Sequence, residues 1–575
     1  MSFNPLRLLG ISLSGVVVLG LCLSPGLSSA ERATLSNPLR FDKAVVVSQD
    51  AIASRVGKAM LEKGGNAVDA AVATAFALAV VHPSAGNLGG GGFLVVRLPD
   101  GTARAFDFRE KAPLTATPEM FLDANGRYNR QRHHWSILSV GVPGSVAGLA
   151  LVHTRLGKLP WKDLVEPAVL LATRGFPVSR GLAESLAEVL PKMTKYPASM
   201  AQFSRGGTPL GEGNLLVQAD LGRTLERIRD QGAAGFYEGE TADLIVREME
   251  RQGGLIRHED LRRYQAVERE PVTGTYRGYK IISMPPPSSG GVALIEVLNI
   301  LEGYDLGNLG FHGSRSSHLM IEAMRRGFAD RARFLGDADR IGVPVPRLTS
   351  KEYAAKLRRT VLPERASRSS PETFEWPTGN SETTHLSVVD GNLLAVALTT
   401  TIERYYGSRI VVPGAGFLLN NEMGDFNPAA GLTDSQGLIG TAPNLVEPEK
   451  RMLSSMTPTI VVKGQKPFLV LGSPGGRTII NSVLEVVVNV IDHRMSIQDA
   501  VDAPRFHHQW LPDRVFTEPF CFSPDTRSAL ERMGHRLELR RLPQGSVMAI
   551  AVSPNSGVLD AGVDRRRPDA GAAGF

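Results

Sequence analysis

The chain has 575 residues, of which 42% are hydrophobic and 21% charged, so most of it is expected to fold as an ordinary soluble globule. Its 64 basic and 58 acidic residues leave a modest net charge of +6, and no Lys- and Arg-rich block with interleaved aromatic residues occurs. A nucleic-acid partner is therefore not expected. The length allows several domains or one large layered domain with insertions.

The N-terminus predicts a targeting segment. Arg7 is followed by the apolar run LLGISLSGVVVLGLCL and then by SPGLSSAER, a pattern typical of a secretory signal peptide, here residues 1–30, cut after Ala30. The alternatives are an uncleaved membrane anchor, because the run is nearly long enough to span, and a lipoprotein through Cys22, which the bulky Leu21 disfavours. We expect a secreted, periplasmic protein with no stable membrane span after signal cleavage.

Cysteine usage fits that expectation without adding a cross-link. Only Cys22 and Cys521 occur, and the first leaves with the signal peptide. The mature chain then holds one thiol and cannot form an internal disulfide.

The first mature third alternates helical and strand patterns. Residues 51–81 predict two helices broken at Gly64-Gly65, and residues 93–110 predict a hairpin of FLVVRL and ARAFDFRE around the turn at Asp100-Gly101. The middle, 145–350, is mainly helical, with one long helix in HGSRSSHLMIEAMRRGFADRARFLG. Residues 360–382 are polar, hold three prolines and predict an exposed linker.

Beyond the linker the pattern predicts strands in THLSVVD, LLAVALTTT, SRIVVP, PTIVVK and PFLVLGS, followed by a long helix at 477–493. Strands at both ends with helices between them predict helices that cover stacked sheets. If Gly391-Asn392 is a two-residue turn, Thr383 lies opposite Thr400. One bulge or register step would then bring Thr401 to it.

Common chemical motifs are missing from the sequence. It has no H-E-x-x-H or C-x-x-C, and the pairs His133-His134 and His507-His508 would point to opposite faces if they lay on strands. The mature chain has no G-x-S-x-G, and GNLGGGGF lacks the Gly-Lys-Ser/Thr ending of a phosphate loop. We expect neither a metal nor an organic cofactor.

Thr383 is the strongest nucleophile candidate. A threonine hydroxyl needs a base, and a cut between Glu382 and Thr383 would create an α-amino group with a pKa of ~8 that can take its proton. The mobile linker before Thr383 and the strand after it suit such a cut. The alternative is that two threonines merely begin a strand, where threonine is favoured.

A second candidate element is GSPGG at 472–476, where a strand ends and a helix begins. Backbone N–H groups at a helix start can form an anion hole, and Gly475 and Gly476 would let an acyl-transfer intermediate approach. The alternative is an ordinary strand–helix turn.

Taken together, these stretches resemble the γ-glutamyltranspeptidases of the N-terminal-nucleophile hydrolase superfamily. The matches run in order along essentially the whole mature chain: GGNAVDAAVA, AGNLGGGGF, FDFREKAP, GVPGSVAG, EAMRRGFADR, TTHLSVVD, FLLNNEMGDF, LSSMTPTIVV, GSPGG and DAPRFHHQW. The resemblance implies an α+β, four-layer αββα fold. It also implies a precursor that cuts itself before Thr383 into a large subunit (31–382) and a small catalytic subunit (383–575), which share one αββα domain.

The resemblance also implies an activity and a set of site residues. Thr383 would attack the peptide bond before it, and later the γ-amide of glutathione or another γ-glutamyl donor, which is then released to water, an amino acid or a peptide. The implied partners of Thr383 are Thr401, which hydrogen-bonds the nucleophile, and Gly475 and Gly476, which form the oxyanion hole. The implied substrate contacts are Arg109, Ser454 and Ser455 for the α-carboxylate, and Glu422 and Asp425 for the α-ammonium.

Two positions depart from the family pattern. Glu403 stands where the family often has an Asn that helps bind the α-carboxylate, and an ionised carboxylate there would repel the substrate unless it turns away or pairs with a cation. Residues 427–450 match a lid loop, with Gln436 near the place of a pocket-closing aromatic residue. Glu403 keeps open an acylase or amidase for glutaryl- or other glutamyl-type groups. A non-catalytic binding protein on the same fold would keep its chain uncut.

Overall fold

The computed structural model describes residues 38–370, 383–432, 434–435 and 440–575, which belong to one compact unit. The expected signal peptide, Glu382 and Gln436 lie outside these ranges. None of the helices within them combines the length and hydropathy needed to cross a bilayer.

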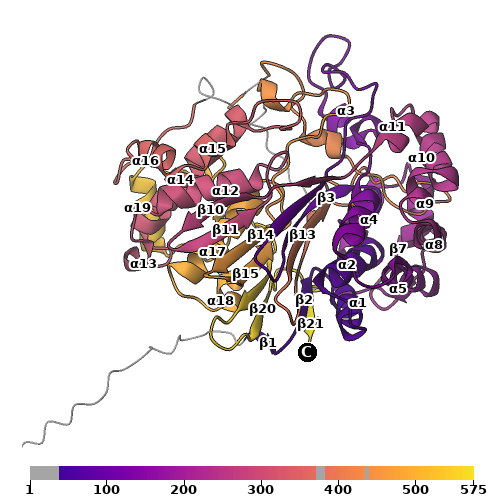
Figure 1. The fold of residues 1–575 in the computed structure, drawn as a ribbon. Helices are drawn as coiled ribbons and strands as arrows, with labels where there is room; N and C mark the ends of the chain where they lie inside the picture. Colours follow the sequence, from indigo (N-terminus) through magenta and orange to yellow (C-terminus); the bar gives the residue numbers. More distant parts are fainter. Residues whose placement is uncertain (1–37, 371–382, 433, 436–439) are drawn as a thin grey trace, which may run out of the picture. The chain divides into compact units, whose positions relative to one another are not determined.

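Two seven-stranded antiparallel sheets form the centre of this unit (Figure 1). The first sheet has the order β21 (Gly571–Gly574), β2 (Val45–Ser48), β12 (Thr383–Val389), β13 (Ala395–Thr401), β3 (Gly91–Arg97), β4 (Ala103–Phe108), β9 (Val267–Arg269). The second has the order β1 (Leu39–Phe41), β20 (Leu559–Val563), β19 (Met548–Val552), β15 (Lys466–Gly472), β14 (Thr459–Lys463), β11 (Tyr279–Ser283), β10 (Val272–Tyr276).

The sheets pack face to face because their strands are apolar on both faces. Val45 and Val47 of β2 point into the core between the sheets, where they join Val470 of β15 and Ile550 of β19. Val46, between them in sequence, points the other way into a core shared with helices. Strands buried on both faces need a layer of helices on each outer side.

Helices supply both outer layers (Figure 1). The core outside the first sheet takes buried residues from α1 (Ala51–Glu62), α2 (Ala67–Val81), α4 (Ser145–Leu156), α5 (Trp161–Arg174), α6 (Arg180–Val189), α7 (Pro197–Phe203), α8 (Ala219–Gln231), α9 (Ala234–Tyr237), α10 (Gly239–Gln252) and α11 (His258–Arg263). The core outside the second takes them from α12 (Gly290–Leu301), α13 (Leu306–Leu309), α14 (Ser314–Phe334), α15 (Val345–Leu348), α16 (Lys351–Arg358), α17 (Thr478–Ile491), α18 (Ile497–Asp502) and α19 (Pro524–Arg532). The expected four-layer αββα arrangement is confirmed.

Most of the predicted elements are present. The helix pair at 51–81 breaks where predicted, the β3–β4 hairpin forms, and α14 and α17 match the two long predicted helices. The predicted strand SRIVVP is wrong. Arg409 has φ +66° and Pro413 follows soon after, so residues 408–413 make only an isolated bridge from Val411 to Leu418.

The β12–β13 hairpin aligns Thr383 with Thr401, with Val389 opposite Ala395 at its closed end. The predicted register, which placed Thr400 opposite Thr383, is therefore wrong by one residue. The alignment brings Thr401 to the nucleophile candidate without any bulge.

The loop explains this register. It is longer than a two-residue turn and contains Leu393 in the left-handed region at φ +61°. Asp390 organises it: its Oδ1 accepts the N–H groups of Asn392 (2.9 Å) and Leu394 (3.1 Å). Its Oδ2 accepts the N–H of Ala67 at the start of α2, at 3.0 Å. The hairpin end is thus fastened to a helix of the outer layer.

Candidate active site

A single cavity gathers the predicted residues at the open end of this hairpin. Its lining includes nine of them: Thr383, Thr401, Arg109, Glu403, Glu422, Asp425, Ser454, Ser455 and Gly476. Gly475 precedes the lining residue Gly476 but does not itself line the cavity, and Glu382 lies outside the described residues.

Thr383 and Thr401 are both buried, at 4% and 2% exposure, on adjacent central strands. Side chains of directly opposed residues in an antiparallel pair lie on one face with their Cβ atoms about 5 Å apart. The N–H of Glu403 donates to Thr401 Oγ1 at 2.9 Å. A hydroxyl that accepts this bond can still donate its own proton, which suits a hydrogen bond from Thr401 to the nucleophile.

The turn between β15 and α17 has the form of an anion site. Gly475 and Gly476 have φ of +126° and +57°, which glycine adopts without strain. A Cβ on Gly475 would lie 2.5 Å from Thr478 Oγ1. Their carbonyls accept hydrogen bonds from the first turn of α17, whereas neither N–H donates to a backbone acceptor among the described residues. These amides can therefore receive a developing negative charge.

Arg109 is the centre of a largely buried ionic cluster, in which the side chain of Asp425 is 31% exposed. It follows β4, and its Nη2 donates to Asp425 Oδ2 at 2.6 Å while Nη1 donates to Glu422 and lies 3.4 Å from Glu110 Oε2. Burial raises the pKa of Glu110 to about 7 and that of Glu422 well above its usual value, although Arg109 opposes both shifts. Glu110 Oε1 and Glu422 Oε2 are buried without a hydrogen-bond partner among the described residues. The cluster presents a cation and under-satisfied carboxylates side by side.

Ser454 and Ser455 approach the cavity from the segment before β14. The Ser455 hydroxyl accepts from Arg331 Nη2 at 2.9 Å, and the Ser454 hydroxyl accepts from the N–H of Met456 at 3.1 Å. Arg331 Nε also donates to Ser289 at 2.6 Å. Both serine hydroxyls can donate their own protons to a carboxylate. Arg331, from α14, was missed as a site residue although the motif that contains it was recognised.

Glu403 does not turn away from the cavity. It follows the end of β13 with φ +74°, and its Oε2 accepts from Asn421 and lies 3.1 Å from Arg404 Nε. Its Oε1 lies 3.9 Å from His134 Nδ1. Burial raises the pKa of Glu403 to about 8, against the lowering effect of Arg404. The sequence identified Glu403 as a candidate site residue but did not identify Asn421, Arg404 and His134 as the residues that lie beside it.

A sequence model described as Gamma-glutamyltranspeptidase matches residues 53–574. The chain belongs to the γ-glutamyltranspeptidase family. Its similarity to the glutathione hydrolase proenzyme of Escherichia coli K12 is 45% identity over 559 residues, which cover 96% of this chain and 95% of the relative.

Solved structures agree with the family and the fold. A cephalosporin acylase from Bacillus halodurans superposes with a TM-score of 0.83 at 27% identity, covering 96% of this chain and 99% of that one. A Helicobacter pylori γ-glutamyltranspeptidase chain gives a TM-score of 0.55 at 45% identity, covering 59% of this chain and 95% of that one. This family member therefore has the N-terminal-nucleophile hydrolase fold.

The histidine pair 133–134 lies beside the site of this family member and not on a strand. Both residues belong to the short helix α3 (Arg130–Trp135), are buried, and line the cavity, with ring centroids 4.3 Å apart. Consecutive side chains on a helix are about 100° apart, and not on opposite faces as they would be on a strand, so both rings can line one cavity.

The expected lid segment borders the same cavity. Asn427, Thr441 and Asn444 line it. Asn427 Nδ2 donates to the Thr441 carbonyl at 2.7 Å, and Asn444 Nδ2 donates to the Asp425 carbonyl at 2.7 Å. Gln436 is not among the described residues, so the predicted change in pocket closure stays a prediction.

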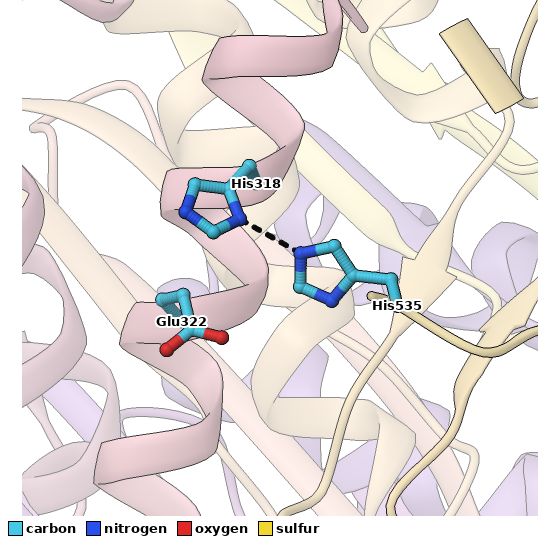
Figure 2. Close-up of side chains that lie close together, drawn as sticks. All are labelled: His318, Glu322 and His535. Atoms are coloured by element: carbon cyan, nitrogen blue, oxygen red, sulfur yellow. Dashed lines mark hydrogen bonds between the residues drawn. The ribbon is translucent and has the colours of Figure 1, made fainter. Parts of the chain in front are cut away.

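One cluster in the described chain offers metal-ligand atoms, His318 and Glu322 on α14 with His535 across from them (Figure 2). His318 Nε2 lies 2.8 Å from the Leu362 carbonyl, so it carries a proton, and His318 Nδ1 accepts from His535 Nε2 at 2.8 Å. Glu322 accepts from Ser367 and from two arginines. The lone pairs of His318 Nδ1 and Glu322 are already in use, whereas His535 Nδ1 is buried without a hydrogen-bond partner among the described residues. The guanidinium groups of Arg325 and Arg326 beside Glu322 disfavour a further cation. The set fits a hydrogen-bonded clamp better than a metal site.

Proposed function

We propose that this protein is a self-cleaving γ-glutamyltransferase and hydrolase. It passes the γ-glutamyl group of glutathione or related compounds to water, amino acids or peptides through a γ-glutamyl–Thr383 ester. The observation that carries the proposal is that Thr383, facing Thr401 at a strand start, shares one cavity with Arg109, Glu422 and Asp425. The name of the Escherichia coli relative, a glutathione hydrolase proenzyme, supports the same substrate class.

Maturation comes first in this proposal. The Thr383 hydroxyl attacks the carbonyl carbon of Glu382, the peptide C–N bond breaks, and an ester forms while the nitrogen becomes the α-amine of Thr383. Water then hydrolyses the ester and frees the Glu382 carboxylate. The products are the large subunit, residues 31–382, and the small subunit, residues 383–575.

Turnover reuses the same hydroxyl with its new base. The α-amine of Thr383, with a pKa of ~8, takes the hydroxyl proton as the oxygen attacks the γ-carbonyl. The N–H groups of Gly475 and Gly476 receive the oxyanion, and Thr401 orients the nucleophile. The C–N bond breaks, the leaving amine takes the proton, and water or an acceptor amine then cleaves the ester by the reverse path.

Recognition of the acyl group follows from the Arg109 cluster. The substrate α-carboxylate takes the guanidinium face of Arg109 together with the hydroxyls of Ser454 and Ser455, and the α-ammonium takes Glu422 and Asp425. A plain glutaryl group has no ammonium and would leave both carboxylates unsatisfied. That argues against the acylase alternative, which Glu403 and the structural likeness to a cephalosporin acylase keep open.

The proposal includes export. Residues 1–30 act as a signal peptide cut after Ala30, and the mature heterodimer works in the periplasm. The apolar run after Arg7 and the Ser-x-Ala end support this. N-terminal sequencing of the large subunit is the direct test, and a start at Glu31 is expected.

The deciding experiment is the intact mass of the purified wild type beside Thr383→Ala, with Thr384→Ala as the matched control. From 61.9 kDa over 575 residues, fragments of 352 and 193 residues weigh about 38 and 21 kDa. We expect both fragments from wild type. We also expect them from Thr384→Ala, because the side chain of Thr384 points to the opposite face of the sheet from that of Thr383. Thr383→Ala should stay whole and lose all γ-glutamyl turnover.

Two other results would redirect the assignment. A wild-type chain that stays whole contradicts the self-cleavage and supports a binding protein. A cut chain that hydrolyses a glutaryl amide faster than the matching γ-glutamyl amide supports the acylase alternative.

A further inference from the structure

Asp107 is a buried carboxylate that is bonded to the backbone of Arg109. It lies in β4, two residues before Arg109, and is fully buried. Its Oδ1 accepts the Arg109 N–H at 2.9 Å, and its Oδ2 accepts from Arg269 Nε of the neighbouring strand β9 at 2.7 Å. Arg451 Nε lies 3.4 Å from Oδ1. Asp107 does not line the cavity, so any effect that it has on a substrate acts through these neighbours.

Asp339 closes a ring of alternating charges with Asp107 and the two arginines. Arg269 donates from its two Nη atoms to Asp339, at 2.9 and 2.6 Å, and Asp339 lies 3.6 Å from Arg451 Nη1. The side chain of Asp339 is 46% exposed and forms the outer edge of the ring, whereas that of Arg451 is 3% exposed. A connected network of this kind holds the segments that carry its members in one arrangement.

The ring joins the two segments that carry the proposed contacts to the α-carboxylate. Strand β4 leads directly into Arg109, and Arg451 is three residues before Ser454. The segments also touch beyond the ring, because Arg109 Nε donates to the Met452 carbonyl at 3.2 Å. Asp107 therefore contacts the chain on both sides of the proposed carboxylate site.

We propose that Asp107 is a positioning residue for substrate recognition, which fixes the spacing between the Arg109 guanidinium and the hydroxyls of the Ser454–Ser455 pair so that both reach one α-carboxylate; the proposal rests on the function proposed above. Both backbone polar groups of Arg109 are held, the N–H by Asp107 and the carbonyl by Tyr264 Oη at 2.8 Å. A guanidinium binds a carboxylate best when its planar fork is correctly placed.

The test compares Asp107→Asn with the matched control Asp492→Asn. The side chain of Asp492 is 2% exposed and accepts from Arg277 Nε at 2.5 Å and from Tyr276 Oη at 2.8 Å, and none of these three residues lines the cavity. In each variant an NH₂ group replaces one carboxylate oxygen and meets a donor where an acceptor is needed. Urea unfolding should therefore show a loss of stability in both variants.

The deciding measurement is the preference for a free α-carboxylate. It compares kcat and KM for a γ-glutamyl anilide with those for the same anilide whose α-carboxylate is converted to a carboxamide. We expect wild type to favour the free acid by about 10² in kcat/KM. Asp107→Asn should reduce this preference to about tenfold, because a misplaced guanidinium loses binding, and the change should fall on KM more than on kcat. Asp492→Asn should keep the wild-type preference.

Intact mass first checks that each variant cuts itself, since self-cleavage uses Thr383 and not the α-carboxylate site. If Asp107→Asn stays uncut, Arg269→Gln takes its place, because it removes the partner of Oδ2 and leaves the Arg109 N–H bond. If neither cuts itself, the ring serves the whole site and the proposal is wrong.

The carboxylate preference then decides between positioning and stability alone. A cut Asp107→Asn enzyme that keeps the wild-type preference overturns the proposal, and so does an equal loss of preference in Asp492→Asn. A wild type that stays uncut, turns over no γ-glutamyl compound or shows no preference for the free acid contradicts the proposed function instead.

Discussion

Two clusters of charged residues in this protein shift the pKa values of their buried carboxyl groups in opposite directions. Around Glu322, each oxygen is saturated: Oε1 accepts from Arg325 and the Ser367 N–H, and Oε2 accepts from Arg326. Burial alone would raise the pKa of Glu322, but these partners lower it to about 2. Around Arg109, burial prevails and the pKa of Glu110 rises to about 7.

This difference indicates a different role for each cluster. A saturated buried carboxylate needs nothing further and stabilises the fold. A buried carboxylate with an unpartnered oxygen, such as Glu422 Oε2, costs free energy until a ligand supplies the missing donor. We therefore expect a substrate to complete the Arg109 cluster, whereas the oxygens of Glu322 already have their donors.

The largest effect is expected from Arg109→Ala. Removing one partner of a buried ion pair costs about 3–5 kcal/mol, because the opposing charges stay buried. We expect kcat/KM for a γ-glutamyl substrate to fall by about 10³ and the free energy of unfolding to fall as well. Steady-state kinetics and urea unfolding check both. Arg109→Lys is the control, since it keeps the charge and loses the planar guanidinium fork. An Arg109→Ala variant whose kcat/KM stays within fivefold of wild type would contradict the assigned role.

Glu322→Gln should affect stability and leave turnover intact. The folded pKa of Glu322, about 2, lies below its usual 4.5, so its ionisation stabilises the fold above pH 4.5. That contribution is lost as pH falls toward 2. The shift corresponds to about 3 kcal/mol at pH 7. Urea unfolding at pH 7 and pH 3 measures it, and we expect a clear loss at pH 7 that shrinks at pH 3, with kcat/KM within twofold. Equal stability at pH 7 would show that the saturated cluster is not stabilising.

Glu422→Gln gives the smallest effect and the opposite sign. Because burial raises the folded pKa of Glu422, its stabilising contribution is present below pH 4.5 and is lost as pH rises. The neutral glutamine should therefore leave stability at pH 7 unchanged or higher. It should lower kcat/KM about tenfold, because a bound substrate ammonium favours the ionised form of Glu422 and glutamine cannot supply that charge. A stability loss like that of Glu322→Gln would remove the distinction between the two clusters.

The sequence predicted which helices and strands form better than it predicted the register between paired strands. Periodicity located α2, α14 and the β3–β4 hairpin because each has a strong local pattern. It placed the β12–β13 register one residue off, because the left-handed Leu393 and the bonds from Asp390 to the loop are not visible in composition. The short strands at the C-terminus, β19, β20 and β21, were not assigned individually, since they are only four or five residues long.

The site could be predicted from the sequence only where its residues lie in motifs of the family and were assigned a role there. The resemblance to the family identified nine of the residues that line the cavity, including Arg109 and Thr401. It did not list His134, Asn421 or Arg404, which come from separate segments and meet only in the folded chain. The protonation state of Glu403 could not be predicted from the sequence either, because its pKa depends on burial and on neighbouring charges that no local pattern indicates.

Asp390 has a consequence far from its own position. It lies seven residues from Thr383, about 23 Å along the strand, yet its bonds to the loop and to α2 fix which threonine faces Thr383. Inserting or deleting one residue in this loop would turn β13 over and exchange its two faces. A change in the length of this distant loop would therefore alter the pocket as surely as a substitution in its wall.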